Sequence, residues 1–243
     1  MPTVLILGAT SDMGIAIGKK FAENKYDVQL AARNPDQLKP VQSDIAIRYG
    51  VQCSLHAFDA LQFSSHEKFF DGLTPKPDVT ICVFGIMDDE LIAFDKWDIT
   101  ERMINTNFTG AVSILNIAAK YYISQKKGTI VGISSVAGER GRESKLIYGS
   151  AKAGFSAFLA GLRNKLYKQN VHVVSVKPGF VYTRMTENIE LPKLLTAQPS
   201  EVADAVFSAV QKKKNVVYVK WFWKYIMLII KYIPEFQFKK MSL

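Results

Sequence analysis

The sequence predicts an α/β protein with a single-domain, Rossmann-like fold: a doubly wound parallel sheet of about seven strands with helices on both faces. Short apolar runs of strand length alternate with helical patterns along the chain. The 243 residues are 48% hydrophobic, which is enough for one sizeable core. A glycine-rich turn, GATSDMG at residues 8–14, joins the first apolar run to the first helical pattern.

Seven apolar runs are expected to be strands, and six patterns between them are expected to be helices. The predicted strands are 3–7, 28–32, 51–58, 79–84, 129–134, 171–176 and 216–219. The predicted helices are 13–24, 35–49, 64–72, 100–126, 148–169 and 200–213. Strands joined by helical crossovers run parallel, and ligands bind beyond their carboxyl ends. Each loop that follows a strand is therefore a candidate site.

Composition narrows the class of protein. The net charge of +9 favours an anionic partner, and a merely basic soluble surface explains it equally well. The histidines and the two cysteines lack metal-ligand spacing, so no metal site is expected. No nucleic-acid recognition module is evident, so no nucleic-acid partner is expected. Free cysteines and the lack of a basic, apolar leader predict a cytoplasmic protein.

The turn at residues 8–14 is a candidate phosphate site. Gly8 ends the first predicted strand and Gly14 opens the first helix, where free backbone N–H groups and the helix dipole attract a pyrophosphate. Two glycines alone are a weak signal, and a plain strand–helix turn is the alternative. Asp12 carries the same sign of charge as a phosphate. We expect its carboxylate to turn away and accept N–H groups at the helix start.

The stretch SSVAGERGRESKLIYGSAK at 134–152 contains the candidate catalytic residues. Tyr148 and Lys152 are four apart on a predicted helix and therefore share a face. An ammonium beside a phenol lowers the phenol's pKa from its ordinary value of roughly 10, which makes Tyr148 a candidate acid/base. Ser135 follows the fifth predicted strand, at the same sheet edge as Gly8, and its hydroxyl is placed to hold a carbonyl oxygen.

Over residues 3–220 the chain resembles the classical short-chain dehydrogenases/reductases. The shared motifs are GATSDMG, HAFDAL, NTNFTG, GISSVAG, YGSAK and KPGFVYT. The resemblance implies that Tyr148 transfers a proton, Lys152 binds the nicotinamide ribose, Ser135 polarises a carbonyl and Asn107 supports a relay water. It implies a cofactor site formed by Gly8, Thr10, Ser11, Met13, Gly14, Arg33, Asp59, Gly85, Tyr148, Lys152, Pro178, Gly179, Val181 and Thr183. It also implies a homo-oligomer.

The sequence departs from the family pattern in two segments that concern the cofactor. Leu7 and Asp12 replace the first threonine and middle glycine of the family's turn, and CVFG stands at 82–85 where NNAG is usual. The second predicted strand ends in Ala32 and Arg33, without the carboxylate that holds the ribose 2′-hydroxyl of NAD. A cation there suits a 2′-phosphate, so NADP(H) is favoured over NAD(H). The alternative is that Arg33 is only a solvated loop residue.

The apolar, basic tail at 221–243 follows the predicted dinucleotide-binding catalytic domain of residues 1–220. Lysines interrupt its apolar run and Pro234 should end its helix, so it is too short to span a membrane. On a helix, Lys220, Lys224 and Lys231 would form one basic stripe beside an apolar and aromatic surface. That pattern suits peripheral contact with the cytoplasmic face of a membrane. The alternative is packing on its own domain or across an oligomer interface.

The acidic turn and the tail together resemble a narrower branch, the polyprenyl-phosphate keto-sugar reductases such as decaprenylphosphoryl 2-keto-pentose reductase. This resemblance implies an NAD(P)H-dependent carbonyl reductase acting on a keto-sugar, linked to a lipid phosphate that Arg184 would face. One alternative is reduction of a soluble ketone, sugar phosphate or acyl substrate, with the tail used for oligomerisation. Another is a non-enzymatic dinucleotide sensor. The substrate loop is predicted at 184–200.

Overall fold

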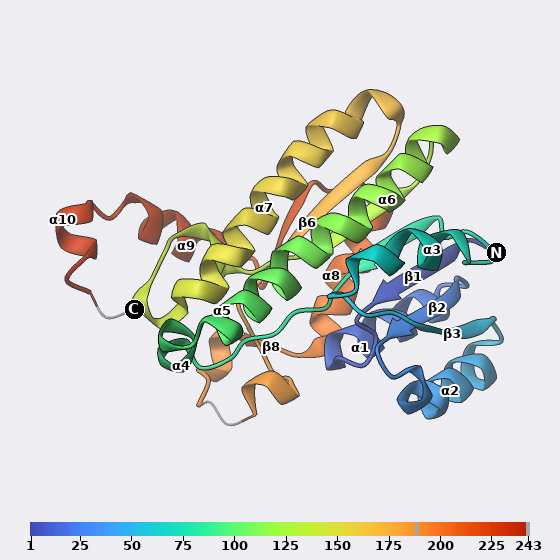
Figure 1. Cartoon of the computed structure of the whole chain (residues 1–243), viewed down its shortest axis with the longest axis horizontal. Helices are drawn as coiled ribbons and strands as arrows, with labels where there is room; N and C mark the ends of the chain where they lie inside the picture. Colours follow the sequence, from blue (N-terminus) through green and yellow to red (C-terminus); the bar gives the residue numbers. More distant parts are fainter. Residues whose placement is uncertain (188–189, 242–243) are drawn as a thin grey trace.

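A parallel sheet forms the centre of the molecule (Figure 1). The computed structural model describes residues 1–187 and 190–241, and within them the main sheet has seven strands in the order β3-β2-β1-β4-β5-β6-β9. Its strands are β1 Thr3–Leu7, β2 Asp27–Ala32, β3 Cys53–Ala57, β4 Val79–Cys82, β5 Thr129–Ile133, β6 His172–Pro178 and β9 Val216–Val219. Every pair in this sheet is parallel. The predicted fold class is therefore confirmed.

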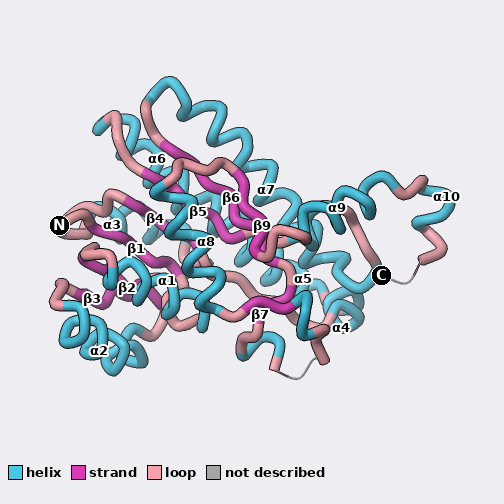
Figure 2. The backbone as a smooth tube through the Cα atoms, turned by 180° about the vertical axis from the view of Figure 1, so that it is seen from behind, coloured by secondary structure: helices cyan, strands magenta, loops and turns pink. Residues whose placement is uncertain are grey.

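Helices cover both faces of the sheet (Figure 2). One face carries α1 Asp12–Glu23, α2 Lys39–Tyr49 and α8 Pro199–Gln211, and the other carries α3 His66–Asp71, α6 Gly110–Gln125 and α7 Leu146–Leu166. Strand side chains alternate between the two cores: Val4 and Ile6 belong to the first, and Leu5 and Leu7 to the second. The strand order reverses between β1 and β4, which opens a crevice at their carboxyl ends.

Several elements differ from the sequence-based expectation. The helix predicted over 100–126 is divided into α5 Trp97–Ile104, a π-helical turn at Asn105–Thr109 and α6. The short helix α4 Glu90–Asp95 was not predicted; it begins after Asp89, whose carboxylate accepts the backbone N–H groups of Leu91 and Ile92. A small second sheet pairs β7 Phe180–Val181 with β8 Thr196–Ala197. Residues 188–189 of the predicted substrate loop lie outside the described residues.

The C-terminal tail forms two helices, α9 Trp223–Tyr232 and α10 Glu235–Phe238, which Pro234 separates as expected. They lie at the opposite end of the long axis from the N-terminus (Figures 1 and 2). The inner face of α9 packs on the domain, because Trp223 and Met227 are buried against Val136. In the described ranges 1–187 and 190–241, no helix combines the length and apolar content needed to cross a bilayer. Tail residues 242–243 lie outside the described residues.

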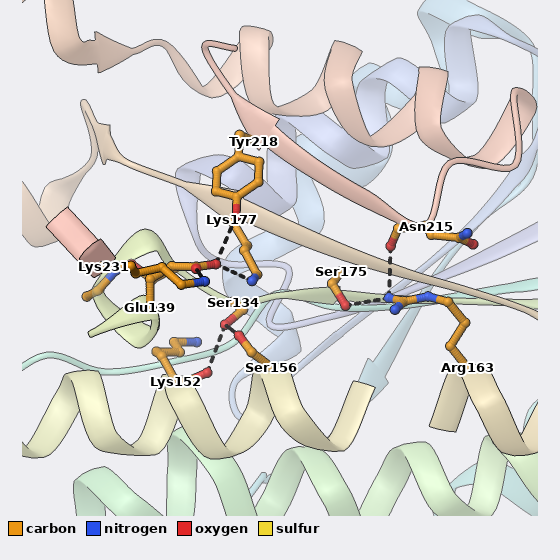
Figure 3. Close-up of polar contacts among 12 residues, drawn as sticks. Ser134, Glu139, Lys152, Ser156, Arg163, Ser175, Lys177, Asn215, Tyr218 and Lys231 are labelled. Carbon is orange, nitrogen blue, oxygen red and sulfur yellow. Dashed lines mark hydrogen bonds and ion pairs between the residues drawn. The ribbon is translucent and has the colours of Figure 1, made fainter. Parts of the chain in front are cut away.

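A buried carboxylate fixes the tail to the domain (Figure 3). Glu139, whose side chain is 2% exposed, accepts hydrogen bonds from Lys177, from the Lys231 ammonium at 2.6 Å and from the Tyr218 hydroxyl at 3.0 Å. We call these four residues the latch. Burial acts to raise the pKa of the Glu139 carboxyl, but the hydrogen bonds from the two lysines outweigh it and the pKa is lowered. The carboxylate therefore stays charged at neutral pH.

The predicted basic stripe of Lys220, Lys224 and Lys231 does not form as expected, because two of these lysines are paired with carboxylates. Lys231 is paired with Glu139, and Lys220 precedes α9 and lies 3.5 Å from a carboxylate oxygen of Glu201. Lys224 is exposed. Next to the latch, the guanidinium of Arg140 donates to the carbonyl oxygens of Ile230 and Ile233, at the C-terminal end of α9. Cations at a helix C-terminus are favourable, so this arrangement also holds α9 in place.

Replacing Glu139 by Gln should lower the free energy of unfolding by about 3 kcal/mol, because the Lys177 ammonium, whose side chain is only 16% exposed, would lose its counter-charge. Urea unfolding at neutral pH measures this change. The matched control is Glu235→Gln, which removes a 78% exposed carboxylate paired with Arg140 and should cost less than about 1 kcal/mol. Equal losses in the two variants would contradict the importance of the latch.

Candidate active site

A cavity of about 670 Å³ lies at the carboxyl ends of the strands and is lined by the loops that follow β1, β2, β4, β5 and β6. Most of the predicted site residues line it: Gly8, Thr10, Ser11, Met13, Arg33, Asp59, Gly85, Ser135, Tyr148, Lys152, Pro178, Gly179, Val181 and Thr183. Gly14 and Asn107 do not line it. The structure thus brings together residues that are up to 175 positions apart in the sequence.

The glycine turn is built for close approach of the backbone. Gly8 has a φ of 94°, and a Cβ added there would lie 2.6 Å from the backbone nitrogen of Phe84, so only glycine fits. The Ser11 hydroxyl donates to the Gly8 carbonyl at 2.9 Å and accepts the Gly14 N–H at 3.0 Å, which caps α1. The start of α1, with its positive dipole end, therefore borders the cavity.

Asp12 does not cap the helix, contrary to expectation. Its carboxylate accepts the backbone N–H of Arg184 at 2.8 Å and lies 3.4 Å from the Nε of the same residue. The Arg184 guanidinium also donates to the carbonyl of Thr10. The ion pair neutralises the charge of Asp12, so this residue does not repel a phosphate at the turn. It also connects the loop after β7 to that turn. Arg184 is therefore engaged by Asp12 rather than directed at a substrate phosphate.

Ser135 and Tyr148 are held together by the connection between β5 and α7. The Ser135 hydroxyl accepts the Ala137 N–H at 3.1 Å, and its interaction with the Tyr148 phenol acts to lower the pKa of that phenol. The start of α7 is capped from outside: the Glu90 carboxylate accepts the N–H groups of Ile147 at 2.8 Å and Tyr148 at 3.1 Å. The sequence offers no local signal for Glu90, since it lies 58 residues before Tyr148 on the unpredicted helix α4.

The predicted lowering of the Tyr148 pKa is wrong. Burial raises the pKa of this phenol to about 12, and the hydrogen bond with Ser135 acts in the opposite direction without reversing the shift. The Lys152 ammonium lies 5.8 Å from the centroid of the Tyr148 ring and donates instead to the Ile133 carbonyl at 3.2 Å. Burial lowers the pKa of Lys152 itself to about 8. Tyr148 therefore holds its proton at neutral pH.

Asn107 stands behind Lys152 in the π-helical turn, a feature that often marks functional sites. Its amide nitrogen donates to the carbonyls of Ile86 at 2.7 Å and Met103 at 2.9 Å. Its Oδ1 is buried without a hydrogen-bond partner among the described residues. A Cβ at Gly85 would lie 2.6 Å from this oxygen and 3.2 Å from the Lys152 ammonium. Gly85 thus keeps open the space beside an unpaired acceptor, and the relay water at Asn107 stays a prediction.

The residues present fit a nicotinamide dinucleotide. The capped turn offers a helix start to a pyrophosphate, and Arg33 at the end of β2 is an exposed cation at the cavity edge. Asp59 lines the same end, its carboxylate accepting the Leu61 N–H at 2.9 Å. Gly85 and the 178–183 loop line the other end, next to Tyr148 and Lys152. These are the residues that would hold the cofactor.

The tail supplies a cavity wall that sequence reasoning missed. Trp223 lines the cavity, and its indole N–H donates to the Leu195 carbonyl at 3.1 Å. A Cβ at Gly179 would lie 2.0 Å from the indole, so the ring rests directly on this glycine. The Phe180 ring meets the indole edge-on with a centroid separation of 5.5 Å. In the sequence, the apolar run of the tail was the only indication that the tail packs on the domain. It did not indicate which side chain would line the cavity.

The low pKa of Lys152 predicts a pH effect on stability. Between about 8 and the ordinary lysine value of roughly 10.4, the unfolded chain holds a proton that the folded chain has lost, so rising pH favours folding. Tyr148, with a raised pKa, acts in the opposite direction only above about pH 10. The stability of wild type relative to Lys152→Met should therefore rise by up to about 2 kcal/mol between roughly pH 8 and 9.5.

Urea unfolding at the two pH values measures this difference. Lys165→Met, on the exposed side of the same helix, controls for removing a lysine from α7. A difference between wild type and Lys152→Met that does not change with pH would contradict the lowered pKa.

Comparisons with known proteins agree with this geometry. An uncharacterized oxidoreductase of Mycobacterium tuberculosis is 30% identical over 241 residues, covering 98% of this chain and 96% of the relative. The 3-oxoacyl-[acyl-carrier-protein] reductase of Aquifex aeolicus is 31% identical over 215 residues, covering 83% and 87%. A short-chain dehydrogenase from Sphingobium yanoikuyae, solved in complex with NADPH, superposes with a TM-score of 0.83 at 22% identity and covers 97% of both chains.

The family model for short chain dehydrogenase matches residues 2–193, which hold the glycine turn, Ser135, Tyr148 and Lys152. The match covers more than half of the chain and contains the whole predicted catalytic set. The chain therefore belongs to the short-chain dehydrogenase family of oxidoreductases.

Proposed function

We propose that this protein is an NADPH-dependent carbonyl reductase. The observation that carries the proposal is the presence of Ser135, Tyr148 and Lys152 in one cavity with the capped glycine turn. Because burial keeps the Tyr148 phenol protonated at neutral pH, this group has a proton to give to a carbonyl oxygen. A non-enzymatic sensor would leave this buried proton donor without a use.

The chain's own residues account for the proton side of the reaction. The substrate carbonyl oxygen accepts hydrogen bonds from the Tyr148 and Ser135 hydroxyls, which orients the carbon toward the nicotinamide end of the cavity. When bound, the reduced nicotinamide supplies a hydride to that carbon. Tyr148 gives its proton to the oxygen as charge develops there, and the Lys152 ammonium stabilises the phenolate that remains. A water molecule that donates a hydrogen bond to Asn107 Oδ1 would connect Lys152 to solvent, so that Tyr148 can be protonated again after turnover.

Replacing Tyr148 by Phe should reduce kcat at least a hundredfold, because general acid catalysis contributes about 10²–10⁴ in rate. NADPH binding, followed by nucleotide fluorescence, should change less than about twofold, since the ring that shapes the site remains. Tyr167→Phe, which alters an 82% exposed tyrosine just after α7, is the matched control. Comparable turnover by Tyr148→Phe would refute the mechanism.

The preference for NADPH over NADH is part of the proposal. Ala32 ends β2 and Arg33 follows it at the cavity edge, and no carboxylate occupies either position to hold a ribose 2′-hydroxyl. Replacing Arg33 by Ala should weaken NADPH binding about tenfold and leave NADH binding nearly unchanged, because only the former carries a 2′-phosphate. Isothermal titration with both nucleotides measures this. Equal effects on the two would assign Arg33 to the solvated surface.

We further propose that the tail docks on an anionic membrane surface. The tail exposes several apolar and basic side chains on α9, on α10 and in the residues that flank them. The exposed apolar residues are Trp221, Tyr225, Leu228, Ile229, Tyr232 and Phe236, and the exposed lysines include Lys224, Lys239 and Lys240. Aromatic residues and lysines favour the headgroup boundary. A symmetric dimer through this face would bring like-charged lysines together, which supports lipid over a second copy. Homo-oligomerisation by another face stays a prediction.

Substituting Tyr225 and Ile229 by Ser should reduce binding to vesicles that contain phosphatidylglycerol about tenfold, because it removes apolar surface that would enter the interface. Flotation with and without the anionic lipid measures this. The control Ile47→Ser removes an 85% exposed apolar residue from α2. Loss of a concentration-dependent dimer, without any change in flotation, would assign this face to self-association.

A keto-sugar carried on a polyprenyl phosphate is the substrate that would combine carbonyl chemistry with a tail at the membrane. A soluble ketone, sugar phosphate or acyl substrate is the alternative. Turnover of NADPH against matched keto-sugars, with and without the polyprenyl phosphate, separates the two. Preference for the free sugars would favour the soluble class.

A further inference from the structure

Two cations, Arg142 and Lys145, line the cavity in the segment that connects Ser135 to Tyr148. They belong to one tight turn, because the backbone N–H of Lys145 donates to the Arg142 carbonyl at 3.1 Å. They precede the proton donor Tyr148 by six and three residues. Neither has a role in the reaction as derived so far, and the sequence alone did not single them out.

The charges around the cavity are unbalanced. Among the described lining residues, six cations stand against three carboxylates: Arg33, Arg102, Arg142, Lys145, Lys152 and Arg184 against Asp12, Asp59 and Asp88. Asp88 pairs with Arg102 at 3.0 Å and Asp12 pairs with Arg184. Within residues 1–187 and 190–241, no ion pair neutralises Arg142 or Lys145. The cavity therefore carries uncompensated positive charge on the segment that leads to Tyr148.

Arg142 also has an unused hydrogen-bond donor. Its Nε is buried and has no partner among the described residues. A buried N–H without an acceptor is unfavourable, and more so on a charged group. Consistent with this, burial lowers the pKa of the guanidinium below its ordinary value. An anion that entered the cavity would supply both the acceptor and the counter-charge.

The position of the pair identifies which ligand carries the anion. The cofactor's pyrophosphate belongs at the capped turn of residues 8–14, and a 2′-phosphate belongs at Arg33 after β2. Arg142 and Lys145 instead lie in the connection between Ser135 and the helix α7 that carries Tyr148, and they line the cavity together with these two residues. The ligand that reaches them is therefore the substrate rather than the nucleotide.

We propose that Arg142 and Lys145 form a subsite for an anionic group, a phosphate or a carboxylate, carried by the ketone substrate. A guanidinium binds such groups through paired N–H donors, and an ammonium adds a point charge. The proposal rests on the proposed function, because it assigns the anion to the molecule reduced at Tyr148. In this proposal Arg142 and Lys145, rather than Arg184, face the substrate phosphate, because Arg184 is bonded to Asp12.

A binding experiment tests the subsite without turnover. The enzyme is saturated with NADP⁺, so that the nucleotide's own phosphate sites are filled, and inorganic phosphate is titrated while tryptophan fluorescence is followed. Trp223 in the cavity wall provides a reporter. The double variant Arg142→Gln/Lys145→Gln should bind phosphate at least tenfold more weakly than wild type.

The matched control is Lys165→Gln/Lys168→Gln, which changes the net charge equally at exposed positions toward the far end of α7. Arg142→Lys, which retains the charge, should recover part of the affinity and shows that loss of folding is not the cause. Equal phosphate affinity in wild type and the Gln double variant would overturn the proposal, as would equal losses in the control.

Kinetics with a matched pair of ketones separates this proposal from the proposed function. For dihydroxyacetone phosphate, kcat/KM should fall at least tenfold in the Gln double variant, while the value for dihydroxyacetone should be unchanged within about twofold. Reduction of both ketones with equal kcat/KM in both enzymes would overturn the subsite and leave the reductase. Phosphate binding lost in the variant, with neither ketone reduced by wild type, would support the subsite and count against the proposed reaction.

The source of the anion is distinguished by two further titrations on the NADP⁺-saturated enzyme. Glycerol 3-phosphate represents a soluble phosphate ester, and farnesyl phosphate represents a lipid phosphate. Both should lose affinity in the Gln double variant if the subsite is real. Tighter binding of farnesyl phosphate by wild type would assign a lipid-linked substrate, and tighter binding of glycerol 3-phosphate a soluble one.

Discussion

The burial of one ammonium group, that of Lys152, is the constraint on which the rest of the site depends. The residue is 4% exposed and sits where β4, β5 and α7 converge. Its backbone carbonyl accepts a hydrogen bond from the Ser134 hydroxyl at 3.0 Å, and that hydroxyl is also bonded to Ser156 at 2.7 Å (Figure 3). Small residues make the approach possible, because a Cβ at Gly138 would lie 2.6 Å from the Lys152 backbone. A positive charge buried this deeply influences the charge state of the groups around it.

The electrostatics of the cavity follow from that burial. The phenol of Tyr148 is neutral and the ammonium of Lys152 is destabilised, so the site is prepared for negative charge to develop on a substrate oxygen. The acidic residue in the turn is neutralised by Arg184 from a distant loop, so it does not oppose this bias. In the reaction that we propose, an oxyanion formed on the substrate would thus meet an environment arranged before the substrate arrives.

Much of the fold, and the gathering of Ser135, Tyr148 and Lys152 in one cavity, was predictable, because both follow from short-range sequence patterns. Buried parallel strands read as continuous apolar runs, and the spacing of Tyr148 and Lys152 places them on one helix face. The tyrosine pKa was predicted wrongly because spacing specifies neighbours but not burial or the direction of a lysine side chain. Two contacts were not predictable, because they join residues far apart in the sequence. Asp12 contacts Arg184 across 172 residues, and Glu90 contacts the start of α7 across 58 residues.

The contact between Gly179 and Trp223 links the tail to the shape of the cavity. Because the indole occupies the space where any side chain at position 179 would go, the two positions are expected to covary among relatives: a larger residue at 179 requires a smaller one at 223. The same contact makes the indole a natural starting point for redesign. Trimming it would extend the cavity toward α9 and admit bulkier ligands while leaving Tyr148 in place.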